Sequence, residues 1–473
     1  MLDPIFSAAN DLPAIFTNAR FGDARLNRRA KLIMERAQAA PSASFPRMMP
    51  NGSELEGLYR FIENDAVTPA ALIDPFIQAT LRHVGSETEV LVVADTTDIG
   101  PSRSAFPDDM GYLTSTRRGF HLHVSLAVRP GQPNLPLGVL DASFHHRGKE
   151  RKRKVHPRQR AKEPDSESVR WRQAAQRVRE AVGPNVRVVH VMDREADDYK
   201  LFAALIAQGD DFVIRVARDR CLDAHEEPAK LYDALHDSEC VAVREVSVSK
   251  RLPHAFEHTN RIHPPRDARM ATLHVRYASV RIKRPSSAPS DLPSNLDLQV
   301  VEVFEPNPPE GEAPITWRLL TPRTVASAAD AMTVVDHYRQ RWVIEEFFKA
   351  LKTGTGLLER QVESVHTLEN VVALSLPLAW HLLVVRSVAR REPNLPAKTY
   401  FSISQLYLLR HLGRIKISEE PTLHEVSFAV AALGGHLKRN GAPGWQTLAA
   451  GLLELRAMER AWALPRPDQR CDQ

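Results

Sequence analysis

The sequence YRQRWVIEEFFKALK, from Tyr338 to Lys352, decides how the chain is interpreted. Its residue types favour helix and contain neither Gly nor Pro, so we expect one continuous helix. At about 100° per residue, a sector of roughly 80° on this helix would carry a phenol, a carboxylate and three cations. The residues in this sector are Tyr338, Arg341, Glu345, Lys349 and Lys352. The opposite face is apolar and can pack on a core.

The polar face of this stretch has two interpretations. A carboxylate among cations suits a divalent metal ion beside DNA phosphates, because the carboxylate ligates the ion while the cations hold the backbone. The alternative is a solvated face with salt bridges one turn apart, such as Glu345 with Lys349. Taken alone, the stretch favours the salt-bridged face, so the decision depends on the rest of the chain.

Composition places the chain among globular proteins. Its 473 residues are too many for one core and indicate roughly two to four domains. The net charge is only +5, which is weak support for a nucleic-acid partner. The local distribution is more informative, because nine Lys or Arg and one acid lie between Arg147 and Lys162.

The cysteines and the apolar segments indicate a cytoplasmic protein without a membrane span. Cys221, Cys240 and Cys471 lack the spacing of a disulfide framework or a zinc site. The N-terminal residues lack the basic start and apolar run of a signal peptide. The longest apolar run, Val371 to Val385, contains a proline and a histidine and is shorter than the roughly 20 residues that span a bilayer. We interpret it as a buried helix or helix pair.

The order of predicted elements is α/β with a β-rich insertion. Helices are expected from residue 11 to about residue 68, after which strands and helices alternate. Between about residues 231 and 320, alternating strands separated by Pro and Ser indicate an antiparallel insertion. Beyond about residue 370 the chain reads as helical. Strands are expected at 89–95, 119–128, 136–144, 186–193, 211–218 and 315–323.

Three acids stand out by their context. Asp95 and Asp193 each end a predicted buried strand, and Glu345 lies on the helix quoted above. Carboxylates at strand ends of one sheet can converge with a helical Glu, and ligands that are all oxygen suit Mg²⁺ or Mn²⁺. Two ions about 3.5–4 Å apart would activate a nucleophile and stabilise the leaving oxygen of a phosphodiester. The alternative for each Asp is a cap or turn role, and the neighbouring acids are competing candidates. These are Asp98, Glu195, Asp197, Asp198 and Glu346.

Several motifs resemble those of bacterial DDE transposases of the insertion-sequence-four family. The central ones are ADTT at Ala94–Thr97, MDREAD at Met192–Asp197, and the Tyr, Arg, Glu and Lys spacing of Tyr338, Arg341, Glu345 and Lys352. The four-residue spacing is specific, whereas an isolated DREAD would be weak. The resemblance extends almost end to end, through FGDARLNRR, LYRFIEN, FVIR, TWRLLT, EEFFKALKTGTG, LGG and PGW.

The resemblance implies an α/β fold with an RNase H-like catalytic core that is interrupted by a β insertion. Helical N- and C-terminal domains would flank this core. The implied division is a helical DNA-binding domain (1–70), the first part of the core (71–230), the β insertion (231–320), the core helix with the Glu (321–369) and a helical dimerisation domain (370–473).

The resemblance also implies roles for individual residues. Asp95, Asp193 and Glu345 would be the catalytic metal ligands for two Mg²⁺ ions per active site, with Mn²⁺ as a substitute. The remaining residues would contact DNA: Tyr338, Arg341 and Lys352 at the phosphates of the transposon end, Trp317 on a flipped base, and Arg60, Arg215 and Lys349 as further candidates. Stacking on an aromatic side chain stabilises an extruded base by roughly 1–3 kcal/mol, which suits Trp. Without the resemblance, Trp317 would be interpreted as a core residue of a strand.

The sequence departs from the family pattern at Phe120 and His121, where tryptophans are expected. This difference puts the details of end recognition in doubt. We expect His121 and His123 to be structural residues, not metal ligands.

The implied function is cut-and-paste DNA transposition. The protein would act as a homodimer on double-stranded DNA, comprising the inverted repeats of the transposon ends and the target, and would be nucleoid-associated when acting. It would cleave by metal-dependent hydrolysis with hairpin formation and join 3′ ends to target DNA. The alternatives are a non-catalytic DNA-binding regulator or inhibitor that keeps the fold, and a DDE-type nuclease without strand transfer.

Overall fold

The computed structural model describes the chain as two units. Unit 1 comprises Met1–Thr88, Asp95–Arg153 and Trp342–Gln473, and unit 2 comprises Glu89–Ala94 and Lys154–Arg341. The basic run from Arg147 to Lys162 lies outside the described residues except for Arg147 itself. The described residues are 4–100, 109–114, 117–131, 135–147, 167–223, 229–236, 238–262, 264–437, 439 and 441–463.

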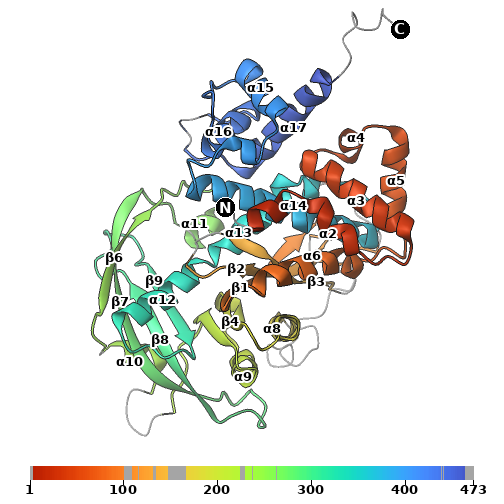
Figure 1. The fold of residues 1–473 in the computed structure, drawn as a ribbon. Coiled ribbons are helices and arrows are strands. Elements are labelled where there is room, and N and C mark those ends of the chain that lie inside the picture. Colours follow the sequence, from red (N-terminus) through yellow and green to blue (C-terminus); the bar gives the residue numbers. More distant parts are fainter. Residues whose placement is uncertain are drawn as a thin grey trace, which may run out of the picture. The chain divides into compact units, whose positions relative to one another are not determined.

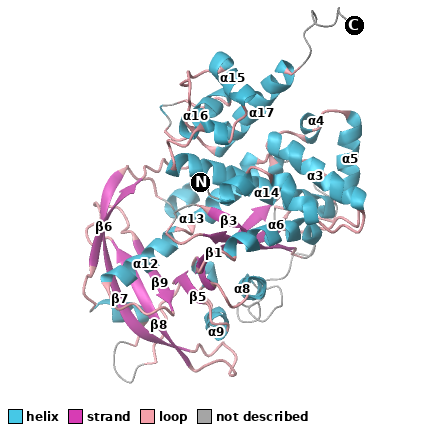
Figure 2. Cartoon of the chain, in the orientation of Figure 1, coloured by secondary structure: helices cyan, strands magenta, loops and turns pink. Residues whose placement is uncertain are grey.

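Unit 2 is built on a mixed sheet (Figures 1 and 2). Its strands are the first part of β1 (Glu89–Ile99), β4 (Arg187–Met192), β5 (Asp211–Arg215), β6 (Ala242–Val248), β7 (Arg269–Lys283), β8 (Asn295–Phe304) and β9 (Thr316–Thr321). Their order is β1-β4-β5-β9-β8-β7-β6. The first three strands are parallel, and β9, β8, β7 and β6 pair antiparallel. The continuous apolar run of β1 fits a parallel strand that is buried on both faces.

Helices cover this sheet and close its core. They are α8 (Glu167–Val182), the 3₁₀ turn η2 (Arg194–Ala196), α9 (Tyr199–Ala207), α10 (Leu231–His236), α11 (Glu257–Ile262) and α12 (Ala328–Arg339). The core includes Phe202 of α9 stacked on Phe212 of β5, with ring centroids 5.4 Å apart. The strands predicted between about residues 231 and 320 are present as the antiparallel β6, β7 and β8, and the short helices α10 and α11 lie in the same segment.

Unit 1 contains a small β structure next to a helix. Its strands are the second part of β1, β2 (Phe120–Val128) and β3 (Pro136–His145), and β2 and β3 pair antiparallel. Helix α6 (Pro69–Val84) packs on β3. Their close approach requires glycine at Gly138, which has φ +142°, because a Cβ there would lie 2.1 Å from the Thr80 hydroxyl.

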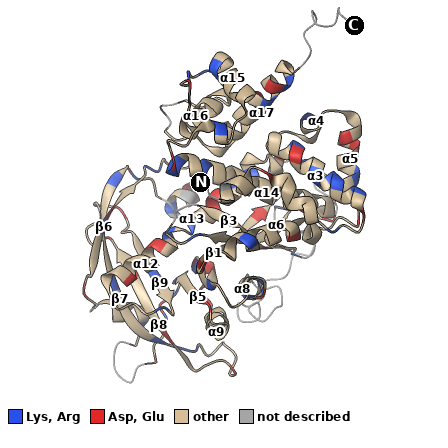
Figure 3. Ribbon diagram, viewed as in Figure 1, with Lys and Arg blue, Asp and Glu red and all other residues tan. Residues whose placement is uncertain are grey.

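The N-terminal part of unit 1 is helical, as predicted. Its elements are α1 (Pro4–Ala9), α2 (Leu12–Ile15), η1 (Phe16–Asn18), α3 (Ala24–Ala39), α4 (Phe45–Met48) and α5 (Gly52–Ile62). Asp23 caps α3 by accepting the Arg25 N–H, and Asn51 caps α5 by accepting the Glu54 N–H. Basic and acidic residues both lie along α3 and α5 (Figure 3).

The C-terminal part of unit 1 is also helical. It begins with α13 (Trp342–Lys349) and the turns η3 (Ala350–Gly354) and η4 (Leu357–Glu359). They are followed by α14 (Val365–Arg391), η5 (Ala397–Thr399), α15 (Ile403–Leu412), α16 (Leu423–Leu433) and α17 (Trp445–Trp462). The apolar run predicted to be a helix or helix pair is part of one helix, α14, which continues through Pro377. Among the described residues α14 has the length and hydropathy of a membrane span, but its most apolar window is 89% buried. It is therefore best explained as the core helix of unit 1.

Candidate active site

The prediction of one continuous helix from Tyr338 to Lys352 is wrong. Helix α12 ends at Arg339, α13 runs over Trp342–Lys349, and η3 (Ala350–Gly354) is a π-helical turn. The Gln340 and Arg341 N–H groups donate to carbonyls three residues earlier, which closes α12 in a tight turn. The cause is tertiary, because α12 packs on the strands of unit 2 and α13 packs on α14 within unit 1. The predicted single polar sector is therefore not formed.

In unit 1, Asp95 lies half-buried on β1. Its Oδ1 accepts a hydrogen bond of 2.7 Å from the Thr96 N–H, which orients the carboxylate. The Thr96 hydroxyl lies 2.9 Å from Nδ1 of His123, a fully buried residue of β2. The Asp95 carboxylate is thus oriented by the backbone of its own strand, and the adjacent Thr96 contacts the neighbouring strand.

His121 and Asp98 form a second polar contact between these strands. Nδ1 of His121 lies 2.9 Å from Oδ1 of Asp98, and the Arg117 guanidinium lies 3.4 Å from Oδ2. Asp98, one of the competing acids, is therefore engaged by an imidazole and a guanidinium. His121, where the sequence departs from the family pattern, has an acidic partner on β1.

Glu345 lies half-buried in the first turn of α13. Its neighbour Glu346 is engaged elsewhere, and exposed Lys349 lies 3.1 Å from a Glu346 carboxylate oxygen. Lys352 lies in the π-helical turn η3. Burial lowers the pKa of the Lys352 ammonium; Asp98 opposes this effect and Arg117 adds to it.

In unit 2, Asp193 follows β4 and caps η2, and its Oδ1 accepts the Glu195 N–H at 2.8 Å. Asp197 at the end of the MDREAD motif and Asp198, which directly follows the motif, have structural roles. Buried Asp197 pairs with Arg220, and Asp198 caps α9 through the Lys200 N–H.

Arg215, Trp317 and Tyr338 gather in unit 2. The Tyr338 and Trp317 rings pack edge to face with centroids 5.3 Å apart, and Tyr338 is only 4% exposed. Arg215 bonds the Tyr338 side chain and donates to the Thr316 carbonyl at 3.0 Å. Burial raises the pKa of the Tyr338 phenol, while Arg215 and Arg341 act in the opposite direction.

Positive charges accumulate around Arg215. Burial lowers the pKa of its guanidinium; Tyr338 opposes this effect, and the charges of Arg194 and Arg341 reinforce it. Sequence analysis missed Arg194, an exposed residue that directly follows Asp193. Its position inside the quoted MDREAD motif was the signal that could have identified it.

Arg60, the N-terminal candidate, is exposed on α5 and forms an ion pair with Glu56 one turn earlier. A pair this exposed contributes about 0–1 kcal/mol to stability. Arg60 is therefore a surface cation and not a buried residue that bridges elements.

The three predicted metal ligands belong to different units: Asp95 and Glu345 to unit 1, Asp193 to unit 2. Within the residues that the structure describes, no group of three or more His, Cys, Asp or Glu side chains is close enough to hold a metal ion. By donor chemistry the three carboxylates fit Mg²⁺ or Mn²⁺, because hard divalent cations prefer oxygen ligands. Their joint action as ligands stays a prediction.

Carboxylates can hold the metal ions of enzymes that transfer phosphoryl groups, and cationic and aromatic side chains bind nucleic acids. Comparison with known protein families identifies the class of protein. Residues 13–67 match the transposase DNA-binding family, and residues 144–376 match the transposase DDE domain. The chain is therefore a transposase of the DDE class, with DNA as its partner and an RNase H-like core. Asp193 and Glu345 lie inside the matched range, whereas Asp95 lies before it. DDE transposases generally use divalent metal ions.

Proposed function

We propose that this chain is a cut-and-paste transposase of the insertion-sequence-four family. It binds terminal inverted repeats, cleaves DNA by metal-dependent hydrolysis with hairpin formation, and joins the 3′ ends to target DNA. In this proposal Asp95, Asp193 and Glu345 bind two Mg²⁺ ions, for which Mn²⁺ substitutes. The ions, when bound, activate the attacking hydroxyl and stabilise the leaving oxygen.

The observation that carries this proposal is the register of β1 and β4. The last paired residues of these parallel strands are Val93 and Val191. Asp193 directly follows the last residue of β4, and Asp95 lies within β1, two positions after Val93. Asp193 thus lies at the carboxyl end of a parallel strand, where ligand sites of parallel sheets occur. In Asp95 and in Asp193, one carboxylate oxygen accepts a hydrogen bond from a backbone N–H, and this bond restricts the direction of the second oxygen of the same carboxylate.

We propose that Arg215, Tyr338, Arg341 and Lys352 bind the phosphates of the transposon end and that Trp317 stacks on a flipped base. The support is the electrostatics of unit 2, where like charges and burial oppose the charged form of Arg215. A phosphate would relieve this repulsion and accept hydrogen bonds from the guanidinium groups. Arg60 and Lys349 are exposed cations and are proposed as weaker contacts along the DNA.

A homodimer in the cytoplasm completes the proposal. Helices α15 and α17 carry exposed apolar side chains, including Ile403 at 86% and Trp462 at 51% exposure, which suit a protein interface. We propose that α15 and α17 form the contact between two protomers when two transposon ends are brought together. We also propose that the five domains given in Sequence analysis are the functional modules of the chain.

The decisive experiment replaces Glu345 by Gln in the full-length protein. We expect Glu345→Gln to bind end-containing DNA in Ca²⁺ as the unmodified protein does, and to lose Mg²⁺-dependent cleavage. Glu363→Gln is the matched control, since it removes an exposed acid elsewhere in unit 1. Unchanged cleavage by Glu345→Gln would refute the assigned site.

Two further assays separate the alternatives. Pre-cut ends offered with target DNA test strand transfer, and an enzyme that nicks but never joins is a nuclease. Tight end binding by the unmodified protein without nicking in either Mg²⁺ or Mn²⁺ identifies a non-catalytic regulator.

A further inference from the structure

Glu346, the residue after the proposed metal ligand Glu345, connects α13 to two C-terminal helices. Its Oε2 accepts a hydrogen bond of 3.1 Å from Trp445 Nε1 at the start of α17, and it forms an ion pair with Arg386 of α14. Its Oε1 bonds Lys349 within α13. One side chain therefore joins three helices of unit 1.

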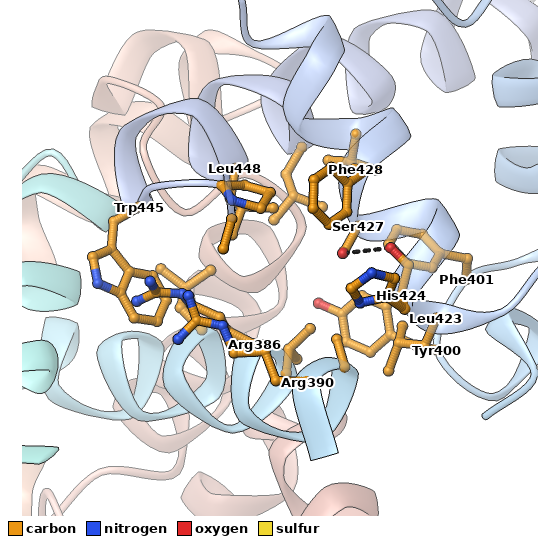
Figure 4. A pocket seen from close by; sticks show the side chains of 17 residues that line it. Arg386, Arg390, Tyr400, Phe401, Leu423, His424, Ser427, Phe428, Trp445 and Leu448 are labelled. Atoms are coloured by element: carbon orange, nitrogen blue, oxygen red, sulfur yellow. Dashed lines mark hydrogen bonds between the residues drawn. The ribbon is translucent and has the colours of Figure 1, made fainter. Parts of the chain in front are cut away.

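Arg386 and Trp445 form a compact arrangement around this carboxylate. The Arg386 guanidinium lies over the Trp445 ring (Figure 4), 4.3 Å from the ring centroid. The Arg386 side chain is 16% exposed. The cationic side chains of Arg386 and Lys349 both contact the Glu346 carboxylate, and charge-assisted bonds of this kind are stronger than neutral ones.

A cavity of about 60 Å³ adjoins this arrangement and is lined by α14, α16 and α17. Arg386, Trp445 and Leu448 line one part of it, and His424 and Phe428 another (Figure 4). Because the cavity adjoins the Trp445 ring, fewer packing contacts hold this ring in place. The hydrogen bond to Glu346 therefore contributes more to the position of the ring.

The short length of α13 makes the contacts of Glu346 important for the position of this helix. This helix has only eight residues and continues into the π turn η3, so its own hydrogen bonds give it little rigidity. Neighbouring side chains on a helix are separated by about 100°, so a rotation of α13 that moves Glu346 moves Glu345 by the same angle. Metal sites tolerate displacements of roughly 0.5 Å or less.

We propose that Glu346 is a positioning residue for Glu345, held by Arg386 and Trp445, so that α14 and α17 set the orientation of the metal ligand. This inference rests on the proposed function of Glu345. It assigns to the C-terminal helices a contribution to metal binding in the same protomer.

The test measures the Mg²⁺ dependence of end cleavage for full-length Trp445→Phe and Glu346→Gln. Trp445→Phe keeps an aromatic ring for Arg386 to stack on and removes the indole N–H donor together with part of the ring volume. We expect a half-saturating Mg²⁺ concentration about 10-fold higher, with cleavage recovering at high Mg²⁺ and end binding in Ca²⁺ unchanged. Glu363→Gln, which removes an exposed acid elsewhere in unit 1, is the control and should match the unmodified protein.

The outcomes are distinguishable. If Trp445→Phe and Glu346→Gln lower only the unfolding temperature and keep the unmodified Mg²⁺ dependence below it, the positioning role is wrong and these residues are merely structural. If Glu346→Gln does not fold, Trp445→Phe alone decides in the same way. If Glu345→Gln itself cleaves normally, the proposed site fails, independently of the role of Glu346.

Discussion

Replacing Asp197 should destabilise unit 2 more than any other single loss of charge in the MDREAD motif. Asp197 is 5% exposed, and its Oδ1 accepts the Arg220 Nε–H at 2.8 Å. Its Oδ2 accepts the N–H groups of Ala217 at 2.7 Å and Arg218 at 3.1 Å. Asp197→Leu would leave a buried guanidinium and two backbone donors without this acceptor.

The size of the effect follows from these contacts. Removing one partner of a buried ion pair costs about 3–5 kcal/mol, because the other charge stays buried. The double variant Asp197→Leu with Arg220→Met removes both charges and should recover part of that loss. Each backbone donor that remains unbonded costs about 1–3 kcal/mol, so the recovery is incomplete.

Urea unfolding gives the free energies of the four proteins in this cycle, and hydrogen exchange read by mass spectrometry reports the segment 216–220 directly. We expect faster exchange at Ala217 and Arg218 in both Asp197 variants, with the larger loss of stability in the single one. The reasoning is refuted if Asp197→Leu costs less than about 1 kcal/mol, the range of an exposed pair. It is also refuted if the double variant is no more stable than the single one.

Three other predictions concern separate features. His381 is buried, with a pKa lowered by desolvation from 6.5 to about 4, so the folded protein gains stability as pH rises from 4 to 6.5. His381→Gln should remove about 3 kcal/mol of that pH dependence in urea unfolding. Tyr338→Phe removes a hydroxyl that bonds Arg215 and should weaken binding of end DNA about 10-fold in gel shifts, whereas equal affinity would exclude a role for the hydroxyl. Gly451→Ala would put a Cβ 1.8 Å from a carbonyl oxygen of α16 and should cost about 1–3 kcal/mol in thermal unfolding, whereas Gly52→Ala, in open space, should not.

The strands of the sheet could be predicted from sequence because their pattern is local. The run from Glu89 to Asp95 is apolar over its length and ends in an acid, and the structure contains it as part of β1. The antiparallel strands of the insertion could be predicted equally well, because polar and apolar residues alternate along each strand and Pro-rich segments separate the strands. The helices α10 and α11 inside it are six residues each, too short for periodicity to reveal them.

The break between α12 and α13 could not be predicted, because nothing in the local sequence demands it. Gln340 and Arg341 are good helix formers. The turn at these residues separates α12, which packs within unit 2, from α13, which packs within unit 1. The same limit applies to Asp197 and Glu346. As acids in the sequence they were indistinguishable from ligand candidates, and only their partners Arg220 and Arg386 reveal structural roles.

The π turn at Ala350–Gly354 has a consequence for how this chain tolerates insertion and deletion. A π turn is geometrically an α-helix that has gained one residue, so it behaves as a local excess of chain length. Deleting one residue within it would restore a regular α-helical turn and leave the segment beyond at nearly the same rotation, because the π turn absorbs the extra residue. Deleting one residue from α13 itself would instead rotate the segment beyond by about 100°. The segment from Ala350 to Gly354 is therefore expected to tolerate the loss of one residue better than α13 does.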